Sequence, residues 1–180
     1  MNESETTRMH KAEAPKKLKF AVIICSSSRY EELKAKGKAE DPSGELITSI
    51  LESAGHRVVY KAIVPDNSAM IRIELKKIIS EKEIDAAIFC GGTGISPSDV
   101  TIETVKPLME KVLPGFGEIF RWLSYQEIGS AAILSRALAG TAEGKAIFCI
   151  PGSPHAVRLC VEKLILPEAA HIVKHVREKP

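Results

Sequence analysis

Aromatic and amide side chains are both scarce in this chain. Phe, Trp and Tyr make up 5% of its 180 residues, with a single Trp. Amides are rarer still, because only Asn2, Asn67 and Gln126 occur. A low content of heat-labile amides is typical of thermophile proteins, whereas the four cysteines point the other way. The few aromatics are also uneven, since four of them lie between Phe116 and Tyr125.

The chain also has no large excess of positive or negative charge. The chain has 25 Lys and Arg against 23 Asp and Glu, a net charge of +2. This small excess lies in residues 1–19, which hold five basic and three acidic side chains, so the rest of the chain is formally neutral. Bulk electrostatics therefore exclude a nucleic-acid partner attracted by charge alone.

The chain also lacks long apolar runs and cysteine motifs. No run approaches the ~20 residues needed to cross a bilayer, and the polar N-terminus has no apolar signal-peptide core. We therefore expect a cytoplasmic protein with no membrane partner. The four cysteines show no CxxC or Cys/His ligand spacing, and the five histidines form no ligand cluster, which argues against zinc and disulfides.

The length and the 44% of hydrophobic residues fit one globular domain. We expect a flexible N-terminal tail at residues 1–17 and a single domain at residues 18–180. Apolar runs predict strands at 18–25, 56–64, 86–90 and 145–150. Helical periodicity predicts helices at 43–54 and 68–80, from about Thr101, and from about Pro154 with a kink at Pro167. This alternation predicts an α/β fold, a three-layer α/β/α arrangement with a mostly parallel sheet.

Glycine-rich turns follow two of the predicted strands. The segment Gly91-Gly92-Thr93-Gly94 ends the strand at 86–90 and can place backbone N–H groups around an anion. It is neither a Walker A loop nor a GxGxxG fingerprint, and a tight turn is an equally good interpretation. Pro151-Gly152-Ser153-Pro154 repeats the arrangement before the last helix, where a capping turn is again the alternative.

Three acids are expected at the same edge of the sheet. Asp99 follows the glycine loop, Asp66 ends the strand at 56–64, and Asp41 precedes the helix at 43–54. A carboxylate beside bound phosphate requires a bridging cation such as Mg²⁺. Capping is the simpler interpretation for Asp41, and it stays open for Asp66.

Several ordered motifs resemble the MoaB/MogA family of molybdenum-cofactor biosynthesis over about residues 18–176. They are Phe20–Ser28, Asp41-Pro-Ser-Gly, Val64-Pro-Asp-Asn, Gly91-Gly-Thr-Gly with Ser98-Asp-Val-Thr, Pro114-Gly-Phe-Gly-Glu-Ile-Phe-Arg121, Leu134-Ser-Arg136 and Pro151-Gly-Ser-Pro. The stretch Ser124–Gly129 is similar to the MoaB branch. The resemblance implies the molybdopterin-binding α/β fold and Mg-ATP-dependent adenylylation of molybdopterin in the molybdenum or tungsten pathway.

The resemblance also implies the site residues. It makes Asp66 and Asp99 the catalytic and Mg²⁺-binding acids. It assigns substrate and nucleotide binding to Ser27, Arg29, Asp41, Ser43, Gly91, Gly92, Thr93, Gly94, Ser98, Glu118, Arg121, Gly152 and Ser153. In this chain Pro97-Ser98-Asp99 replaces the frequent Pro-Arg-Asp, which removes a cation near the phosphates.

Partners and alternatives follow from the same resemblance. The family forms trimers and hexamers, and the aromatic cluster at 116–125 is expected to build a subunit interface. A catalytically silent pterin-binding or scaffold protein is one alternative function. A nucleotide pyrophosphatase of the related competence-damage-inducible family is another.

Three further patterns support no additional site. Cys25-Ser-Ser-Ser-Arg29 is too short for the Cys-x5-Arg phosphatase loop, so Cys25 is expected in the core. The charge-rich segment 31–41 is expected to be a mobile, solvated loop, and Pro114-Gly115 is expected to mark a turn.

Overall fold

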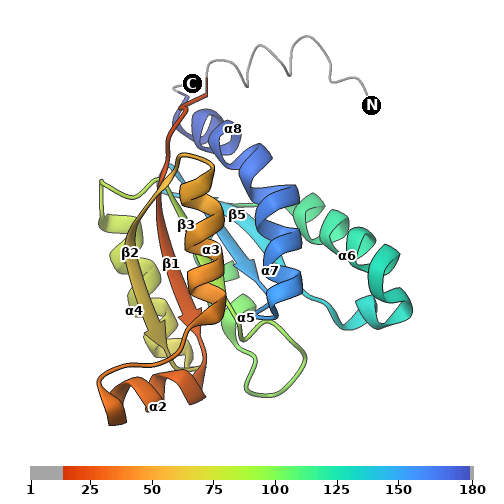
Figure 1. The fold of residues 1–180 in the computed structure, drawn as a ribbon. Coiled ribbons are helices and arrows are strands. Elements are labelled where there is room, and N and C mark those ends of the chain that lie inside the picture. The colour runs from red at the N-terminus through yellow and green to blue at the C-terminus, as the bar shows by residue number, and fades with distance from the viewer. Residues whose placement is uncertain (1–13, 179–180) are drawn as a thin grey trace.

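A six-stranded sheet organises the molecule in a computed structural model that describes residues 14–178. The strand order is β2-β1-β3-β6-β5-β4, with helices on both faces (Figure 1). The three-layer α/β/α prediction is confirmed. Most of the expected tail at 1–17 lies outside the described residues.

Four parallel strands form the half of the sheet that carries the glycine loop. They are β1 (Lys19–Cys25), β2 (Arg57–Val64), β3 (Ala86–Cys90) and β6 (Lys145–Ile150). Every residue of β3 and β6 is buried. A strand covered by helices on both faces is apolar along nearly all of its length, which is why these runs were recognisable in the sequence. Lys145 at the start of β6 is the exception, and its Nζ donates to the Glu81 and Ile84 carbonyls.

The helices divide between the two faces of the sheet. Residues of α3 (Pro42–Ser53), α7 (Pro154–Cys160) and α8 (Leu166–Arg177) pack on one face, with Phe120 of α6 (Pro114–Ile128). On the other face α4 (Ser68–Ser80) buries Ile71, Leu75 and Ile78, beside α5 (Thr101–Val105). The predicted interruption of the last helix takes the form of a π-helical turn, Val161–Ile165, just before Pro167.

Two local predictions were wrong. The segment 31–41 is not a loop along its whole length, because α2 (Ser27–Lys36) covers its first half. The Ser26 side chain caps this helix, Gly37 ends it with φ +69°, and Lys36 pairs with Glu32 one turn away. Pro114 does not mark a turn but opens α6, where its missing N–H costs nothing.

The antiparallel end of the sheet was not predicted. Strand β5 (Leu138–Ala142) pairs with β6 through a two-residue turn, in which Glu143 and Gly144 have φ of +47° and +74°. These angles suit the right-handed twist of a tight hairpin. Two-residue β4 (Lys111–Val112) completes this edge after the 3₁₀ turn Lys106–Leu108, and a second 3₁₀ segment, Gly129–Leu134, links α6 to β5.

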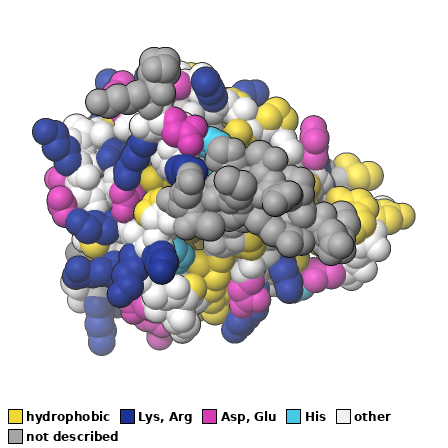
Figure 2. Space-filling view, turned by 90° about the horizontal axis from the view of Figure 1, so that it is seen from above, with side chains coloured by type: hydrophobic (Ala, Val, Ile, Leu, Met, Phe, Trp, Pro, Cys, Tyr) yellow, Lys and Arg dark blue, Asp and Glu magenta, His cyan; other side chains and the backbone are white. Residues whose placement is uncertain are grey.

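The surface is uneven in character. Figure 2 shows Lys and Arg side chains gathered on the side of β2 and α4, and hydrophobic side chains protruding on the opposite side, where α6 lies. Large exposed hydrophobic residues of α6 and the following 3₁₀ segment include Trp122 and Ile133, at 62% and 78% exposure. Within residues 14–178, no helix is both long and apolar enough to span a membrane.

Candidate active site at the carboxyl ends of the parallel strands

Three loops meet where the parallel strands end. The Gly91 N–H donates to the Ile150 carbonyl (3.0 Å), which joins the loop after β3 to the end of β6. The Ser43 hydroxyl donates to the Gly152 carbonyl (2.9 Å), which ties the start of α3 to the loop after β6. Ligands of open parallel sheets bind in the crevice at this edge, so these contacts fix the shape of the candidate site.

Asp66 is held on one side of the glycine loop. Its Oδ2 accepts hydrogen bonds from both the backbone N–H and the hydroxyl of Ser27, each at 2.9 Å. Gly92 has φ +59°, and a Cβ there would lie 2.8 Å from Asp66 Oδ1 and 2.6 Å from Thr101 Oγ1. The absence of a side chain at Gly92 therefore allows Asp66 to approach the loop.

Asp99 is held on the loop's own continuation. Its Oδ2 accepts from the Ser96 N–H (2.8 Å), and its N–H donates to the Ser96 carbonyl (2.9 Å). Among the described residues, Asp66 Oδ1 and Asp99 Oδ1 accept no hydrogen bond. Each carboxylate therefore has one oxygen fixed by the protein and one available to a ligand.

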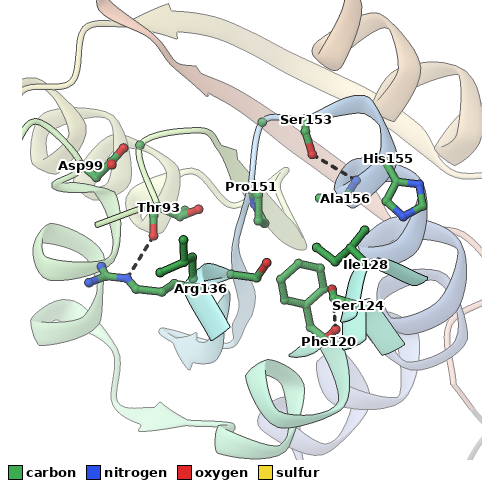
Figure 3. A pocket seen from close by; sticks show the side chains of 15 residues that line it. Thr93, Asp99, Phe120, Ser124, Ile128, Arg136, Pro151, Ser153, His155 and Ala156 are labelled. Carbon is green, nitrogen blue, oxygen red and sulfur yellow. Dashed lines mark hydrogen bonds between the residues drawn. The ribbon is translucent and has the colours of Figure 1, made fainter. Parts of the chain in front are cut away.

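A cavity of about 310 Å³ opens beside this loop (Figure 3). One wall is the glycine loop with Asp99, a second comes from the loop after β6 and the start of α7, and a third comes from α6 and the segment before β5. The lining residues are Gly92, Thr93, Gly94, Asp99, Phe120, Ser124, Ile128, Leu134, Ser135, Arg136, Pro151, Gly152, Ser153, His155 and Ala156.

Arg136 brings a cation to this cavity. Its Nε donates to the Thr93 carbonyl of the glycine loop (3.0 Å; Figure 3). Its Nη2 pairs with Glu103. Thr93 is only 3% exposed, so its carbonyl depends on protein donors. Arg136 therefore fixes the loop and places a guanidinium at the site, where planar N–H groups suit phosphate oxygens.

Cysteine chemistry is excluded at the end of β1. Burial raises the pKa of Cys25 and of Cys90 to about 12. At neutral pH both are thiols, and a thiol is a poor nucleophile. The expectation that Cys25 belongs to the core is confirmed.

The chain is similar to known proteins over most of its length. Residues 21–171 match the family model described as a probable molybdopterin binding domain. The chain belongs to this family. Molybdenum cofactor biosynthesis protein B of Bacillus subtilis (strain 168) is 46% identical to this chain over 170 residues, 94% of this chain and 96% of that protein.

Archaeal relatives agree with the bacterial one. Molybdopterin adenylyltransferase of Pyrococcus furiosus is 45% identical over 173 residues, 94% of this chain and 97% of that protein. The crystal structure of the tungsten cofactor synthesizing protein MoaB from Pyrococcus furiosus superposes with a TM-score of 0.80 at 43% identity, covering 92% of this chain and all of that one. The resemblance to the MoaB/MogA family is thereby confirmed.

The structure of this chain brings many of the expected site residues to one edge of the sheet. The cavity lining contains Asp99, Gly92, Thr93, Gly94, Gly152 and Ser153, and Gly91 stands directly before it. The Ser153 hydroxyl also caps α7 by accepting from the Ala156 N–H (3.3 Å). Ser98 is exposed and lies outside the lining, with its hydroxyl 3.0 Å from that of Ser96.

Other expected site residues have local structural partners. The buried Asp41 carboxylate caps α3 by accepting from the Gly44 N–H (2.9 Å), as the simpler interpretation of the sequence held. Asn67, rather than Asp66, caps α4. Arg29 lies in the first turn of α2, next to Ser27.

Glu118 and Arg121 lie on α6 but do not line the cavity. Glu118 is exposed, and Arg121 borders a separate shallow hollow with Trp122, Tyr125, Ala132 and Ile133. Residues of this hollow overlap the aromatic cluster noted in the sequence, which places Arg121 beside the expected subunit interface.

Sequence reasoning missed four polar residues that line the cavity: Ser124, Ser135, Arg136 and His155. Arg136 was noted only as part of the Leu134-Ser-Arg136 motif, and His155 was assigned no role. The His155 Nε2 contacts a Glu127 carboxylate oxygen, which links α7 to α6 at the cavity rim. Proximity of Pro151-Gly-Ser-Pro to His155 was the available signal for the histidine.

The donor set fits a hard divalent cation shared with a substrate. Residues 14–178 contain no group of three or more His, Cys, Asp and Glu that could hold a metal ion by themselves. Mg²⁺ does not need such a group, since it commonly binds one or two carboxylates and takes its other ligands from phosphates and water. Asp66 Oδ1 and Asp99 Oδ1, which accept no hydrogen bond within residues 14–178, are oxygens of the type that Mg²⁺ prefers.

Proposed function

We propose that this chain is a molybdopterin adenylyltransferase of molybdenum or tungsten cofactor biosynthesis, with ATP and molybdopterin as substrates. The observation that carries the proposal is the pair of acids, Asp66 and Asp99, fixed on either side of the Gly92–Gly94 loop by hydrogen bonds to single carboxylate oxygens. The full-length similarity to an adenylyltransferase of Pyrococcus furiosus supports it.

The reaction requires positioning rather than a protein nucleophile. A terminal phosphate oxygen of molybdopterin attacks the α-phosphorus of ATP, the new P–O bond forms, and the bond to the β-phosphate oxygen breaks with release of pyrophosphate. Holding both polyanions in line supplies much of the rate acceleration. Backbone N–H groups of the Gly91–Gly94 loop are suited to bind phosphate oxygens.

Charge neutralisation comes from two sources in this proposal. Asp66 and Asp99 would hold Mg²⁺, which supplies Lewis-acid stabilisation of the charge on the phosphates. Arg136 adds a guanidinium that is fixed by its hydrogen bond to the Thr93 carbonyl. It can thereby compensate for Ser98, which stands where related sequences often carry arginine.

The subunit arrangement and location complete the proposal. Hydrophobic side chains of α6 and the following 3₁₀ segment, among them Trp122, Tyr125 and Ile133, are more than half exposed. Such a patch on a protein of this size marks an interaction surface. We therefore expect a trimer or hexamer in the cytoplasm, with small-molecule substrates and no nucleic-acid or membrane partner.

Pyrophosphate release tests the proposed function. The full-length chain is mixed with ATP, Mg²⁺ and molybdopterin, and pyrophosphate and adenylylated pterin are quantified together. We expect equimolar products, and we expect Asp99→Asn to lower the rate by about 100-fold or more because several kcal/mol of transition-state stabilisation are lost. Glu52→Gln, a change of the same kind at an exposed site on α3, is the matched control and should transfer at the wild-type rate.

Two outcomes would overturn the proposed function, and a third would overturn the role of Asp99. Pterin binding without pyrophosphate would indicate a silent binding protein. Hydrolysis of ADP-ribose without pterin would indicate a nucleotide pyrophosphatase. Full transfer by Asp99→Asn would remove the acid from the catalytic scheme.

A further inference from the structure

Three buried threonine hydroxyls have no hydrogen-bond partner within residues 14–178. They belong to Thr101, Thr104 and Thr141, each at most 6% exposed. A buried hydroxyl without a partner is destabilising, so buried hydroxyls are normally paired. Thr101 is distinguished by its position, because it opens α5 directly behind the glycine loop, and its N–H donates to the Gly92 carbonyl (3.0 Å).

The Thr101 hydroxyl and the Asp66 carboxylate meet beside Gly92. A Cβ on Gly92 would lie 2.6 Å from Thr101 Oγ1 and 2.8 Å from Asp66 Oδ1. Two oxygens this close to one point can be joined by a hydrogen bond, either directly or through one water. The three atoms nearest this point include none from Thr104 or Thr141.

Asp66 has a free oxygen for this donor. The N–H and the hydroxyl of Ser27 both donate to Asp66 Oδ2, and they leave Oδ1 without a donor among the described residues. An ionised carboxylate oxygen has two lone pairs, so Oδ1 can accept from Thr101 and still offer one lone pair to a cation. A donor at each oxygen restrains rotation of the carboxylate more than two donors at one oxygen do.

The Cys25 thiol is the competing partner. Burial raises the pKa of Cys25 to about 12, and the Thr101 hydroxyl partly opposes this rise, so the two groups are neighbours. At neutral pH the sulfur is a thiol, which is a weak donor and a weak acceptor. The Asp66 carboxylate is the stronger acceptor, because a hydrogen bond with one ionised partner is roughly twice as strong as a neutral one.

We propose that Thr101 is a positioning residue for Asp66, whose Oδ1 accepts from the Thr101 hydroxyl directly or through one buried water. The missing side chain of Gly92 is what lets the two oxygens come together. The effect on catalysis rests on the proposed adenylyl transfer, in which Asp66 holds Mg²⁺. The contact itself does not depend on that function and can be tested without substrate.

Thermal melts of the full-length chain test the contact. Thr101→Val replaces the hydroxyl by a methyl group of similar shape, and the loss of a hydrogen bond to a charged group should lower Tm by roughly 3–10 °C. Thr104→Val is the matched control, because it removes an equally buried hydroxyl from the same short helix. Removal of an unpartnered hydroxyl should leave Tm unchanged or raise it.

A double-mutant cycle assigns the loss to Asp66. In an Asp66→Ala background, Thr101→Val should lower Tm by less than half as much as in the wild type, whereas Thr104→Val should have the same effect in both backgrounds. In a Cys25→Ala background, Thr101→Val should keep its full effect. An unchanged or higher Tm for Thr101→Val, an equal loss with and without Asp66, or a loss that disappears in Cys25→Ala would each overturn the contact.

Adenylyl transfer supplies the second readout. Thr101→Val should lower kcat by about tenfold, the equivalent of one such hydrogen bond in the transition state. Thr101→Ser keeps the hydroxyl and should restore most of the rate, and Thr104→Val should transfer at the wild-type rate. Equal rates for Thr101→Ser and Thr101→Val would overturn the positioning role. If the wild-type chain shows no transfer, the proposed function fails, and the melts still decide whether Thr101 contacts Asp66.

Discussion

Replacing Gly92 by alanine tests the geometry of the glycine loop. Gly92 has φ +59°, a backbone conformation that L side chains rarely adopt. A Cβ there would also meet Asp66 Oδ1 at 2.8 Å and Thr101 Oγ1 at 2.6 Å, both closer than real Cβ contacts. The substitution therefore combines backbone strain with displacement of a site carboxylate.

Gly37 separates these two effects. It ends α2 with φ +69°, and a Cβ there would have nothing within 4 Å. Gly37→Ala should therefore show the backbone cost alone, about 1–2 kcal/mol. Gly92→Ala should lose a further 1–3 kcal/mol or so through overpacking against Asp66 and Thr101.

Melting temperature and adenylyl transfer are the two readouts. For a chain of this size, 1 kcal/mol corresponds to roughly 2–4 °C in Tm, so Gly37→Ala should melt about 2–8 °C lower and Gly92→Ala lower still. Gly37→Ala should transfer at the wild-type rate, whereas Gly92→Ala should lose activity because Asp66 is displaced from its bonds with Ser27. If Gly92→Ala has the same Tm as Gly37→Ala and retains full activity, the inferred contact between Gly92 and Asp66 is wrong.

Two further predictions concern the surface and pH. Trp122→Glu should convert the expected trimer or hexamer to smaller species in light scattering, because a charge replaces an exposed ring in the hydrophobic patch; a monomeric wild-type chain would contradict this. His56 accepts the Leu18 N–H at Nδ1 (3.1 Å), and burial lowers the His56 pKa. The unfolded chain therefore takes up the proton at higher pH than the folded one, so Tm should fall as pH drops below about 6.5, and less steeply in His56→Gln. Equal slopes would show that another group controls the pH dependence.

The parallel half of the fold could be predicted because its signals are local. Strands β3 and β6 are continuous apolar runs, and each is followed by a glycine-containing turn. Strand β5 gave no such signal, since Leu138–Ala142 consists mainly of small residues and is defined by its pairing with β6. Helix α2 was missed because it has no buried residue, so no apolar periodicity marks it.

The candidate site likewise contains residues that could be predicted from the sequence and residues that could not. Asp66, Asp99 and the glycine loop stand directly after strands, where ligands of parallel sheets are expected. The role of Arg136 depends on contact with Thr93, 43 positions away, and no local pattern reports such a contact.

The bond between the Ser43 hydroxyl and the Gly152 carbonyl spans 109 positions of the chain. Closing so long a segment carries an entropic cost, so contacts of this kind form late relative to the β5–β6 hairpin, whose strands are neighbours in sequence. Because the cavity lining also includes Gly152 and Ser153, which follow β6, no fragment ending before β6 can assemble it. During synthesis, substrate binding would begin only after the last strand and α7 had left the ribosome, so ligand binding reports completion of the whole domain.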